Sequence, residues 1–353
     1  MIDLMRYSCQ LSLSGFGKKA QEKLFKSKVL VVGVGGLGCP VSVYLTAAGV
    51  GAIGICDFDN VSLKNLHRQI LYEEKDVGKS KVRVATKRLK KQNPSANIVG
   101  IIDKITSKNV LKIIEGYDII VDCTDNFGTR YLLNDACVIL KKPLVYGAIF
   151  QFEGQVSLLN VRNSNGTYSA NYRDIFPSAD DVSVPNCDEG GVIPTIAGAI
   201  GSVQANEVIK YITGAGELLI SRLFIFDAKN LTSTKIELPT VSKFKISVIE
   251  DIEVPLITVL QLRKAFQQRK FELFDVRTEE EHGKFNIGGK NIPLDELNNR
   301  VSELPLDKSL VFYCRSGARS AQAVRQILNS YPKANIASLD GGIIAWQDKA
   351  IRG

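Results

Sequence analysis

A glycine-rich turn between an apolar run and a helix-like run is the feature that most constrains this chain. Residues 29–38 read VLVVGVGGLG, and a helix-like pattern follows from 37 to 48. This order predicts a buried strand, a tight turn and a helix start, where backbone N–H groups suit a phosphate. Asp57 ends the next apolar run, where a ribose-binding acid is expected. The turn occurs in NAD, FAD and ATP enzymes alike, so NAD remains open at this point. The candidate glycines are Gly33, Gly35, Gly36 and Gly38.

Positive charge soon after Asp57 favours ATP over NAD. The chain continues through DFDNVSLKNLHRQ, which contains Arg68, and GKSK, which contains Lys81. Two cations suit a triphosphate, whose charge must be neutralised as it leaves, whereas NAD needs little extra positive charge. A later apolar run ends in DCTDN, at the expected carboxyl edge of a parallel sheet, where Asp125 offers Mg²⁺ a carboxylate. The sequence therefore predicts an ATP–Mg²⁺ site.

The order of apolar runs predicts an α/β fold with a doubly wound, mainly parallel sheet and an antiparallel extension. The expected strands are 29–32, 52–56, 98–102, 118–121, 143–150 and 155–161, and a hairpin follows at 222–238. The expected helices are 37–49, 77–92, 107–114, 126–140 and 192–214. The stretch 162–191 between them lacks periodicity, which is typical of a lid or binding loop.

A second small α/β domain is expected after a linker. At 353 residues the chain exceeds one typical domain. We place a first domain at 1–240, a linker at 241–254 and a second domain at 255–353. Expected strands in the second domain are 271–276, 309–314 and 334–339, and expected helices lie near 294–303 and at 317–329.

The second domain presents a cysteine where a strand runs directly into a helix. In FYCRSGARS, Cys314 opens a loop whose N–H groups, helix dipole and two arginines, Arg315 and Arg319, favour a thiolate. Four residues separate Cys314 from Arg319, one fewer than in the phosphatase loop. The tighter loop suits a terminal sulfur atom better than a tetrahedral phosphate.

The first domain resembles the ubiquitin-activating-type adenylyltransferases, most of all the bacterial branch that acts on sulfur carrier proteins. The motifs are RYSCQ (6–10), GFGKKAQEKL (15–24), GVGGLGCP (33–40), DFD (57–59), NLHRQ (65–69), VGKSK (77–81) and DCTDN (122–126). The resemblance implies a homodimer that adenylates the C-terminal glycine of a small ubiquitin-like carrier. It assigns ATP binding to Gly36, Asp57, Asn65, Arg68, Lys81, Asp125 and Asn126, with Asp125 also steering Mg²⁺.

The second domain resembles a rhodanese domain. FDVRTEEEH, NIGGKNIPLDEL, CRSGARS and LDGGIIAW match that family in order. The resemblance makes Cys314 the carrier of a persulfide supplied by a donor such as a cysteine desulfurase, and the product a carrier thiocarboxylate. His282 stands where an aromatic is common and receives no role. The persulfide loop comprises Cys314, Arg315, Ser316, Gly317, Ala318 and Arg319.

The sequence differs from the first family at the zinc-binding pairs and at Cys9, and it keeps the loop cysteine, Cys187. The usual zinc-binding C-x-x-C pairs are missing, because Asn171 and Asp174 replace the first and no cysteine lies near 235–250, so no zinc is expected. Cys9 replaces an arginine that reaches the phosphates across the dimer in relatives. Cys187 matches a loop cysteine that some members use catalytically, and it precedes a helix whose dipole would lower its pKa, although Asp188 and Glu189 oppose this.

Composition excludes several other classes. The net charge is +8, but no aromatic-interleaved basic stretch indicates nucleic-acid binding. No apolar run approaches a membrane span, and the N-terminus lacks a signal pattern. Seven cysteines without a regular framework indicate a reducing cytoplasm. We expect four of them to be buried small hydrophobes: Cys39, Cys56, Cys123 and Cys137.

Three rival functions stay open. The chain could adenylate another peptide carboxylate, or act as a non-catalytic nucleotide-binding redox sensor, for which Cys9 is the favouring feature. An NAD oxidoreductase is the third. The motifs favour carrier adenylation with sulfur transfer over all three.

Overall fold

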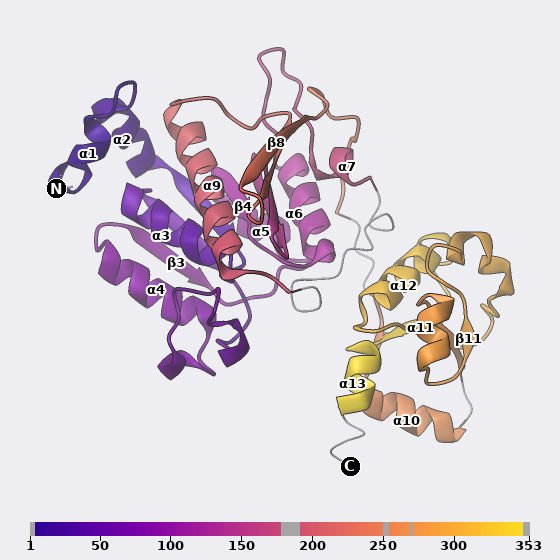
Figure 1. Cartoon of the computed structure of the whole chain (residues 1–353). Coiled ribbons are helices and arrows are strands. Elements are labelled where there is room, and N and C mark those ends of the chain that lie inside the picture. Colours follow the sequence, from indigo (N-terminus) through magenta and orange to yellow (C-terminus); the bar gives the residue numbers. More distant parts are fainter. Residues whose placement is uncertain (1–3, 178–190, 250–253, 269–270, 349–353) are drawn as a thin grey trace. The chain divides into compact units, whose positions relative to one another are not determined.

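The computed structural model describes residues 4–177, 191–249, 254–268 and 271–348. The chain divides into two compact units, Met1–Ile249 and Glu250–Gly353, each of which is described by itself (Figure 1). The limits of the linker at 241–254 remain a prediction.

One eight-stranded sheet organises the first unit, in the order β3-β2-β1-β4-β5-β6-β7-β8. The first five strands in this order are parallel and the last three antiparallel, which confirms the predicted mixed sheet. The parallel strands are β1 (Lys28–Val32), β2 (Ala52–Cys56), β3 (Asn97–Ile101), β4 (Ile119–Asp122) and β5 (Leu144–Phe150). The antiparallel strands are β6 (Glu153–Leu159), β7 (Arg222–Asp227) and β8 (Thr232–Glu237).

Helices cover both faces of this sheet, because its central strands are apolar on both sides. In β1, Val29 and Val31 belong to one core cluster, and Leu30 and Val32 to the other. The first cluster packs against α3 (Gly38–Ala48), α4 (Lys81–Gln92) and α9 (Pro194–Thr213), and the second against α5 (Val110–Glu115) and α6 (Phe127–Ile139). Before β1 lie η1 (Leu4–Tyr7), α1 (Ser8–Leu11) and α2 (Gly17–Lys26).

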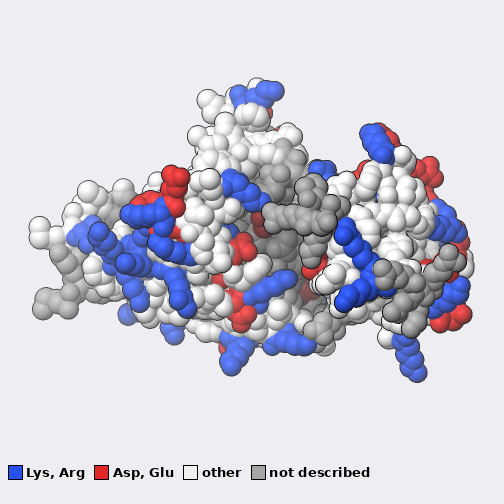
Figure 2. All heavy atoms as spheres, turned by 90° about the horizontal axis from the view of Figure 1, so that it is seen from below, with Lys and Arg blue, Asp and Glu red and all other residues white. Residues whose placement is uncertain are grey.

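Helix α4 is amphipathic. Val82, Ala85 and Leu89 are buried, whereas the cations Arg83, Lys87, Lys90 and Lys91 are exposed. Figure 2 shows Lys and Arg side chains gathered on this part of the first unit. The helix begins at Lys81 rather than at 77, since the Ser80 side chain accepts the Arg83 N–H at 3.4 Å and thereby caps the first turn.

The stretch 162–191, predicted as a lid or binding loop, contains regular structure and contributes Tyr172 and Phe176 to the wall of a cavity. Up to residue 177 this stretch packs on the sheet and contains the short helix α7 (Tyr172–Ile175), in which Tyr172 is buried. Residues 178–190 lie outside the described part of the chain.

The second unit has a five-stranded parallel sheet in the order β11-β10-β12-β13-β9, which confirms the predicted small α/β domain. Its strands are β9 (Leu256–Ile257), β10 (Glu272–Asp275), β11 (Lys290–Asn291), β12 (Leu310–Tyr313) and β13 (Ile336–Leu339). Its helices are α10 (Val259–Gln268), α11 (Glu279–Lys284), α12 (Ala318–Ser330) and α13 (Gly342–Asp348).

The predicted helix near 294–303 is wrong. Two 3₁₀ turns replace it, η5 (Leu297–Asn299) and η6 (Val301–Glu303). Consecutive asparagines favour turns, and Pro305 disfavours a helical conformation at the residue before it. The helices α10, α11 and α13 and the two-residue strands β9 and β11 were not predicted from the sequence.

Candidate functional sites

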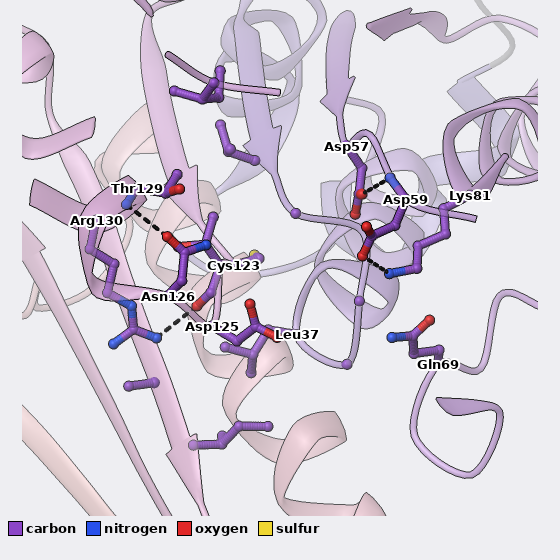
Figure 3. A pocket seen from close by; sticks show the side chains of 18 of the residues that line it. Leu37, Asp57, Asp59, Gln69, Lys81, Cys123, Asp125, Asn126, Thr129 and Arg130 are labelled. Carbon is purple, nitrogen blue, oxygen red and sulfur yellow. Dashed lines mark hydrogen bonds and ion pairs between the residues drawn. The ribbon is translucent and has the colours of Figure 1, made fainter. Parts of the chain in front are cut away.

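A cavity of about 520 Å³ opens beyond the carboxyl ends of the parallel strands of the first unit. The structure brings all nine residues of the predicted nucleotide site to its walls, and Figure 3 labels Asp57, Lys81, Asp125 and Asn126 among them. They are Gly33, Gly35, Gly36, Asp57, Asn65, Arg68, Lys81, Asp125 and Asn126. A site at this edge is where open α/β sheets hold their ligands.

The glycine-rich turn leaves no room for side chains at two positions. Gly33 has a φ of +88°, and a Cβ there would lie 2.7 Å from the carbonyl oxygen of Cys123. A Cβ on Gly38 would lie 1.9 Å from the Gly33 carbonyl oxygen. The turn between β1 and α3 can therefore lie directly against the loop that follows β4.

Asp57 directly follows β2 and is almost fully buried. Its carboxylate accepts the N–H groups of Val34 and Asp59, each at 2.8 Å. Burial raises the pKa of Asp57, while Lys81 and the two amide donors act in the opposite direction. The hydrogen bonds orient the carboxylate at the cavity wall, as an acceptor for hydroxyl groups requires.

Lys81 opens α4 and already has an anionic partner, which the sequence analysis missed. Its Nζ lies 2.8 Å from Oδ2 of Asp59, and the Lys81 side chain is 5% exposed against 51% for Asp59 (Figure 3). The buried cation is thus neutralised from the solvent side of the cavity. Arg68 is also buried, with a guanidinium nitrogen 3.3 Å from Nε2 of His67.

The loop after β4 carries the other candidate residues. Asp125 and Asn126 are both exposed, and Asn126 caps α6 by accepting the Thr129 N–H at 2.8 Å. Arg130, another residue that the sequence analysis missed, is buried behind the loop and donates to the Thr124 carbonyl at 2.7 Å. Its Nε lies 3.8 Å from the buried Asp122 carboxylate, so the pair anchors the loop that presents Asp125.

Aromatic rings form a second wall of the same cavity. Tyr146, Tyr172 and Phe176 line it, and the Tyr146 and Tyr172 ring centroids lie 5.2 Å apart. The Arg130 guanidinium lies 5.3 Å from the centroid of Tyr146. Cys187, the predicted catalytic loop cysteine, lies outside the described residues.

The residues at the expected zinc position do not fit that metal. The Asn171 amide donates to Oγ of Ser242 at 2.7 Å and its oxygen accepts the Arg173 N–H at 2.8 Å. Asp174 accepts the N–H groups of Asn171 and Lys243, each at 2.9 Å. These hydrogen bonds form a clasp between α7 and the segment after β8. None of the residues in the clasp has a thiolate that could bind zinc. The absence of zinc remains a prediction.

Of the four cysteines expected to be small hydrophobes, all are buried: Cys39, Cys56, Cys123 and Cys137. Burial raises the pKa of the Cys39 thiol to about 12 and that of Cys56 to about 12. Thiols of this kind stay protonated and unreactive. Cys9 is exposed on α1.

In the second unit, Cys314 follows β12 and its loop leads into α12, as predicted. The side chain is 1% exposed, and its Sγ accepts the Gly317 N–H at 3.2 Å. Gly317 has a φ of +93°. Gly342, the first residue of α13, lies so close to the loop that a Cβ on it would be 2.4 Å from the Cys314 carbonyl oxygen. Two glycines thus allow two loops to close around the sulfur.

Arg319, one of the two arginines predicted to favour a thiolate, interacts electrostatically with Cys314 and also has a carboxylate partner of its own. Arg319 makes a bidentate ion pair with Glu281, with both N–O distances 2.7 Å, so a carboxylate offsets its charge. The pair fixes the orientation of the loop's last residue. Arg315 is exposed.

Another cluster was missed by the sequence analysis. Asp275, at the end of β10, is fully buried between Arg277 and His282, at 2.6 Å and 2.8 Å from their nearest nitrogens. His282 therefore anchors α11 to the sheet, and this contact accounts for a polar residue at that position.

The comparisons with known proteins agree with this architecture. The ThiF family model matches residues 7–244, and the rhodanese-like domain model matches residues 258–349. The chain belongs to the ThiF family. "Adenylyltransferase and sulfurtransferase MOCS3" of Drosophila grimshawi is 37% identical over 98% of this chain and 84% of its own length. "Probable adenylyltransferase/sulfurtransferase MoeZ" of Mycobacterium tuberculosis is 38% identical over 98% of this chain and 93% of its own length.

This ThiF-family chain also shares its fold with solved structures. E. coli MccB with ATP superposes with a TM-score of 0.57 at 24% identity, over 65% of this chain and 68% of MccB. PaaA superposes with a TM-score of 0.55 at 20% identity, over 67% of this chain and 74% of PaaA. The chain is an enzyme of the combined adenylyltransferase and sulfurtransferase type. Among the described residues, no helix has the length and apolar character needed to cross a bilayer.

Proposed function

We propose that this enzyme uses ATP–Mg²⁺ to adenylate the C-terminal glycine of a small ubiquitin-like sulfur carrier, and then converts the adenylate to a thiocarboxylate. The observation that carries the proposal is the single cavity that gathers an acid for ribose, two cations for phosphates and an open carboxylate. An NAD site would not need the two cations.

Each polar group of the cavity has a role in this reaction. Asp57, fixed by two backbone amides, accepts the ribose hydroxyls. Arg68 and Lys81 neutralise the phosphates, and Asp59 moves away from Lys81 when they bind. Asp125 would hold Mg²⁺, which adds further positive charge beside the phosphates. The carrier carboxylate attacks the α-phosphorus, and pyrophosphate leaves, so positioning and charge neutralisation supply the catalysis.

Sulfur transfer then uses the second unit. The outer sulfur of a Cys314 persulfide attacks the carrier acyl carbon, a C–S bond forms and AMP leaves. A thiol cleaves the resulting S–S bond, which releases the thiocarboxylate and leaves Cys314 in a disulfide with that thiol. Cys187 is the chain's candidate for this thiol. The covalent link between both units raises the effective concentration of sulfur near the hydrolysable adenylate.

Two further parts of the proposal rest on the resemblance: the enzyme acts as a homodimer, and a cysteine desulfurase or similar donor loads Cys314. Three others rest on the residues themselves: the enzyme works in the cytoplasm, it holds no zinc, and it binds no nucleic acid. Another cation takes over the task of the arginine that Cys9 replaces.

Mass spectrometry of the carrier after incubation with ATP and a sulfur source tests the proposal. Wild-type enzyme should yield adenylate and thiocarboxylate, whereas Cys314→Ala should stop at the adenylate with unchanged ATP–pyrophosphate exchange. ATP–pyrophosphate exchange that depends on a short peptide and not on a carrier would favour adenylation of another peptide carboxylate. ATP binding without any turnover would favour a redox sensor. No exchange with any carrier, or thiocarboxylate from Cys314→Ala, would overturn it.

A further inference from the structure

Two fully buried serines lie directly behind the sulfur of Cys314. Ser320, in the first turn of α12, has its Oγ 3.6 Å from Sγ of Cys314. The same hydroxyl lies 2.7 Å from Oγ of Ser338, which comes from the neighbouring strand β13, and 3.2 Å from the carbonyl oxygen of Gly317. Both serines have 0% exposure. No water can therefore satisfy their hydroxyl groups from outside.

Counting protons sets the direction of the bond between the serines. Each hydroxyl carries one proton, and the only side-chain hydrogen bond found for Ser338 in the described chain is the one to Ser320. If Ser320 donated its proton to Ser338, Ser338 could not donate to Ser320 in return. The Ser338 proton would then be buried without the Ser320 oxygen as its acceptor, which is unfavourable. Ser338 therefore donates, and the proton of Ser320 is left for the sulfur or the Gly317 carbonyl.

The charge of the sulfur decides between these two acceptors. A thiolate or persulfide anion attracts a hydroxyl proton more strongly than a neutral carbonyl does. Cys314 is 1% exposed, so its anion must be stabilised by protein groups. Gly317 N–H supplies one donor at 3.2 Å, and the charge of Arg319 is offset by Glu281. A second, uncharged donor is thus what the buried anion lacks.

We propose that Ser320 is a catalytic residue that donates a hydrogen bond to the ionised sulfur of Cys314, and that Ser338 is a positioning residue that directs the Ser320 proton toward it. The inference rests on the proposed function only in giving Cys314 the reactive sulfur. The relay runs from β13 through the first turn of α12 to the end of β12, so it depends on elements that meet only in the folded unit.

The test is the rate of iodoacetamide alkylation of Cys314 as a function of pH in the full chain, read by mass spectrometry of the Cys314 peptide. Ser320→Ala should move the midpoint of the curve up by about one pH unit, because a hydrogen bond to a charged group is lost, and slow alkylation about tenfold at pH below the midpoint. Ser338→Ala should shift it in the same direction by less. Ser302→Ala, at an exposed serine, is the matched control and should leave the midpoint unchanged.

A double-mutant cycle separates a relay from two independent effects. If Ser338 acts through Ser320, then Ser338→Ala should shift the midpoint in the wild-type background and not in Ser320→Ala. Equal shifts in both backgrounds would overturn the positioning role, and an unchanged midpoint in Ser320→Ala would overturn the whole proposal. Should Ser320→Ala fail to fold, Ser338→Ala alone still decides, since an unchanged midpoint there contradicts the relay.

Alkylation requires neither ATP nor carrier. If Ser320→Ala shifts the alkylation midpoint but the wild-type enzyme makes no thiocarboxylate, the proposed function is refuted and this inference stands. If the enzyme makes thiocarboxylate but Ser320→Ala leaves the midpoint unchanged, this inference is refuted and the proposed function stands.

Discussion

The cavity of the first unit and the sulfur loop of the second would hold their proposed anions in opposite ways. The cavity is wide, about 520 Å³, and neutralises its buried Lys81 with a half-exposed carboxylate, Asp59. The sulfur loop encloses Cys314, and amide and hydroxyl groups contact the sulfur directly.

Under the proposed function, the difference follows from what each site has to release. A triphosphate arrives from solvent, carries several charges and leaves in two pieces, so the protein needs full cations that the ligand can reach. A persulfide is one atom added to the chain's own cysteine. For a single buried charge, fixed dipoles that need no reorganisation suffice, and a free cation would make the sulfur a poorer nucleophile.

The largest expected effect tests whether the cavity depends on full charge. Lys81→Ala should lower carrier-dependent ATP–pyrophosphate exchange by about 10²–10³-fold, because a buried cation aimed at the phosphates is lost. Lys91→Ala, at an exposed lysine on the same helix, is the control and should exchange normally. Persulfide loading of Cys314 should be equal in both variants. Comparable exchange in the two variants would show that the cavity does not act through Lys81.

The second prediction concerns the carboxylate that neutralises Lys81. Asp59→Asn should lower the free energy of unfolding by about 1–3 kcal/mol, since a buried cation loses its partner. Saturating ATP–Mg²⁺ should reduce this deficit, because phosphates then neutralise Lys81. Thermal unfolding with and without nucleotide measures both effects, and Glu115→Gln, at an exposed carboxylate, serves as the control. A deficit that ATP leaves unchanged would mean that Asp59 does not compete with the phosphates.

The clasp at the expected zinc position gives a third prediction. Asn171→Ala should destabilise the protein by about 1–3 kcal/mol, because it removes an N-cap and leaves Ser242 without this donor. A chelator such as EDTA should leave the melting temperature of the wild-type protein unchanged. Stoichiometric zinc in the purified protein, measured by elemental analysis, would contradict the clasp.

The smallest expected effect is a pH dependence of the stability that the Glu281–Arg319 ion pair contributes at the sulfur loop. The ion pair with Arg319 lowers the pKa of Glu281 from 4.5 to about 2, although partial burial acts in the opposite direction. A lowered pKa contributes stability above pH 4.5 that is lost as the pH falls toward 2. The difference in melting temperature between wild type and Glu281→Gln should therefore shrink over this interval. A constant difference would show that the pair contributes nothing through charge.

The wound sheet and the cavity were predictable because their signals are local in the sequence. Glycine spacing, apolar runs and acids at strand ends identify elements one at a time, and parallel strands bring their carboxyl ends to one edge. All nine residues predicted for the nucleotide site line the cavity, and each could be named in this way. Asp59 and Arg130 could not, because their importance lies in partners 22 and 8 residues away in the chain.

The second unit shows the same limit. The strand, loop and helix around Cys314 follow from a continuous motif, but Glu281 and Asp275 acquire roles only by meeting residues of other elements. The helix expected near 294–303 failed for another reason, since a short apolar spacing was outweighed by turn-forming asparagines and a proline.

The amino-acid sequence by itself determined the two α/β units, the glycine turn and the reactive cysteine loop, because each depends on neighbours along the chain. Only the tertiary structure decided which charges are neutralised and which hydroxyls face the sulfur. Those properties depend on burial and on distances of a few ångströms between side chains that are remote in sequence, and no local pattern encodes them.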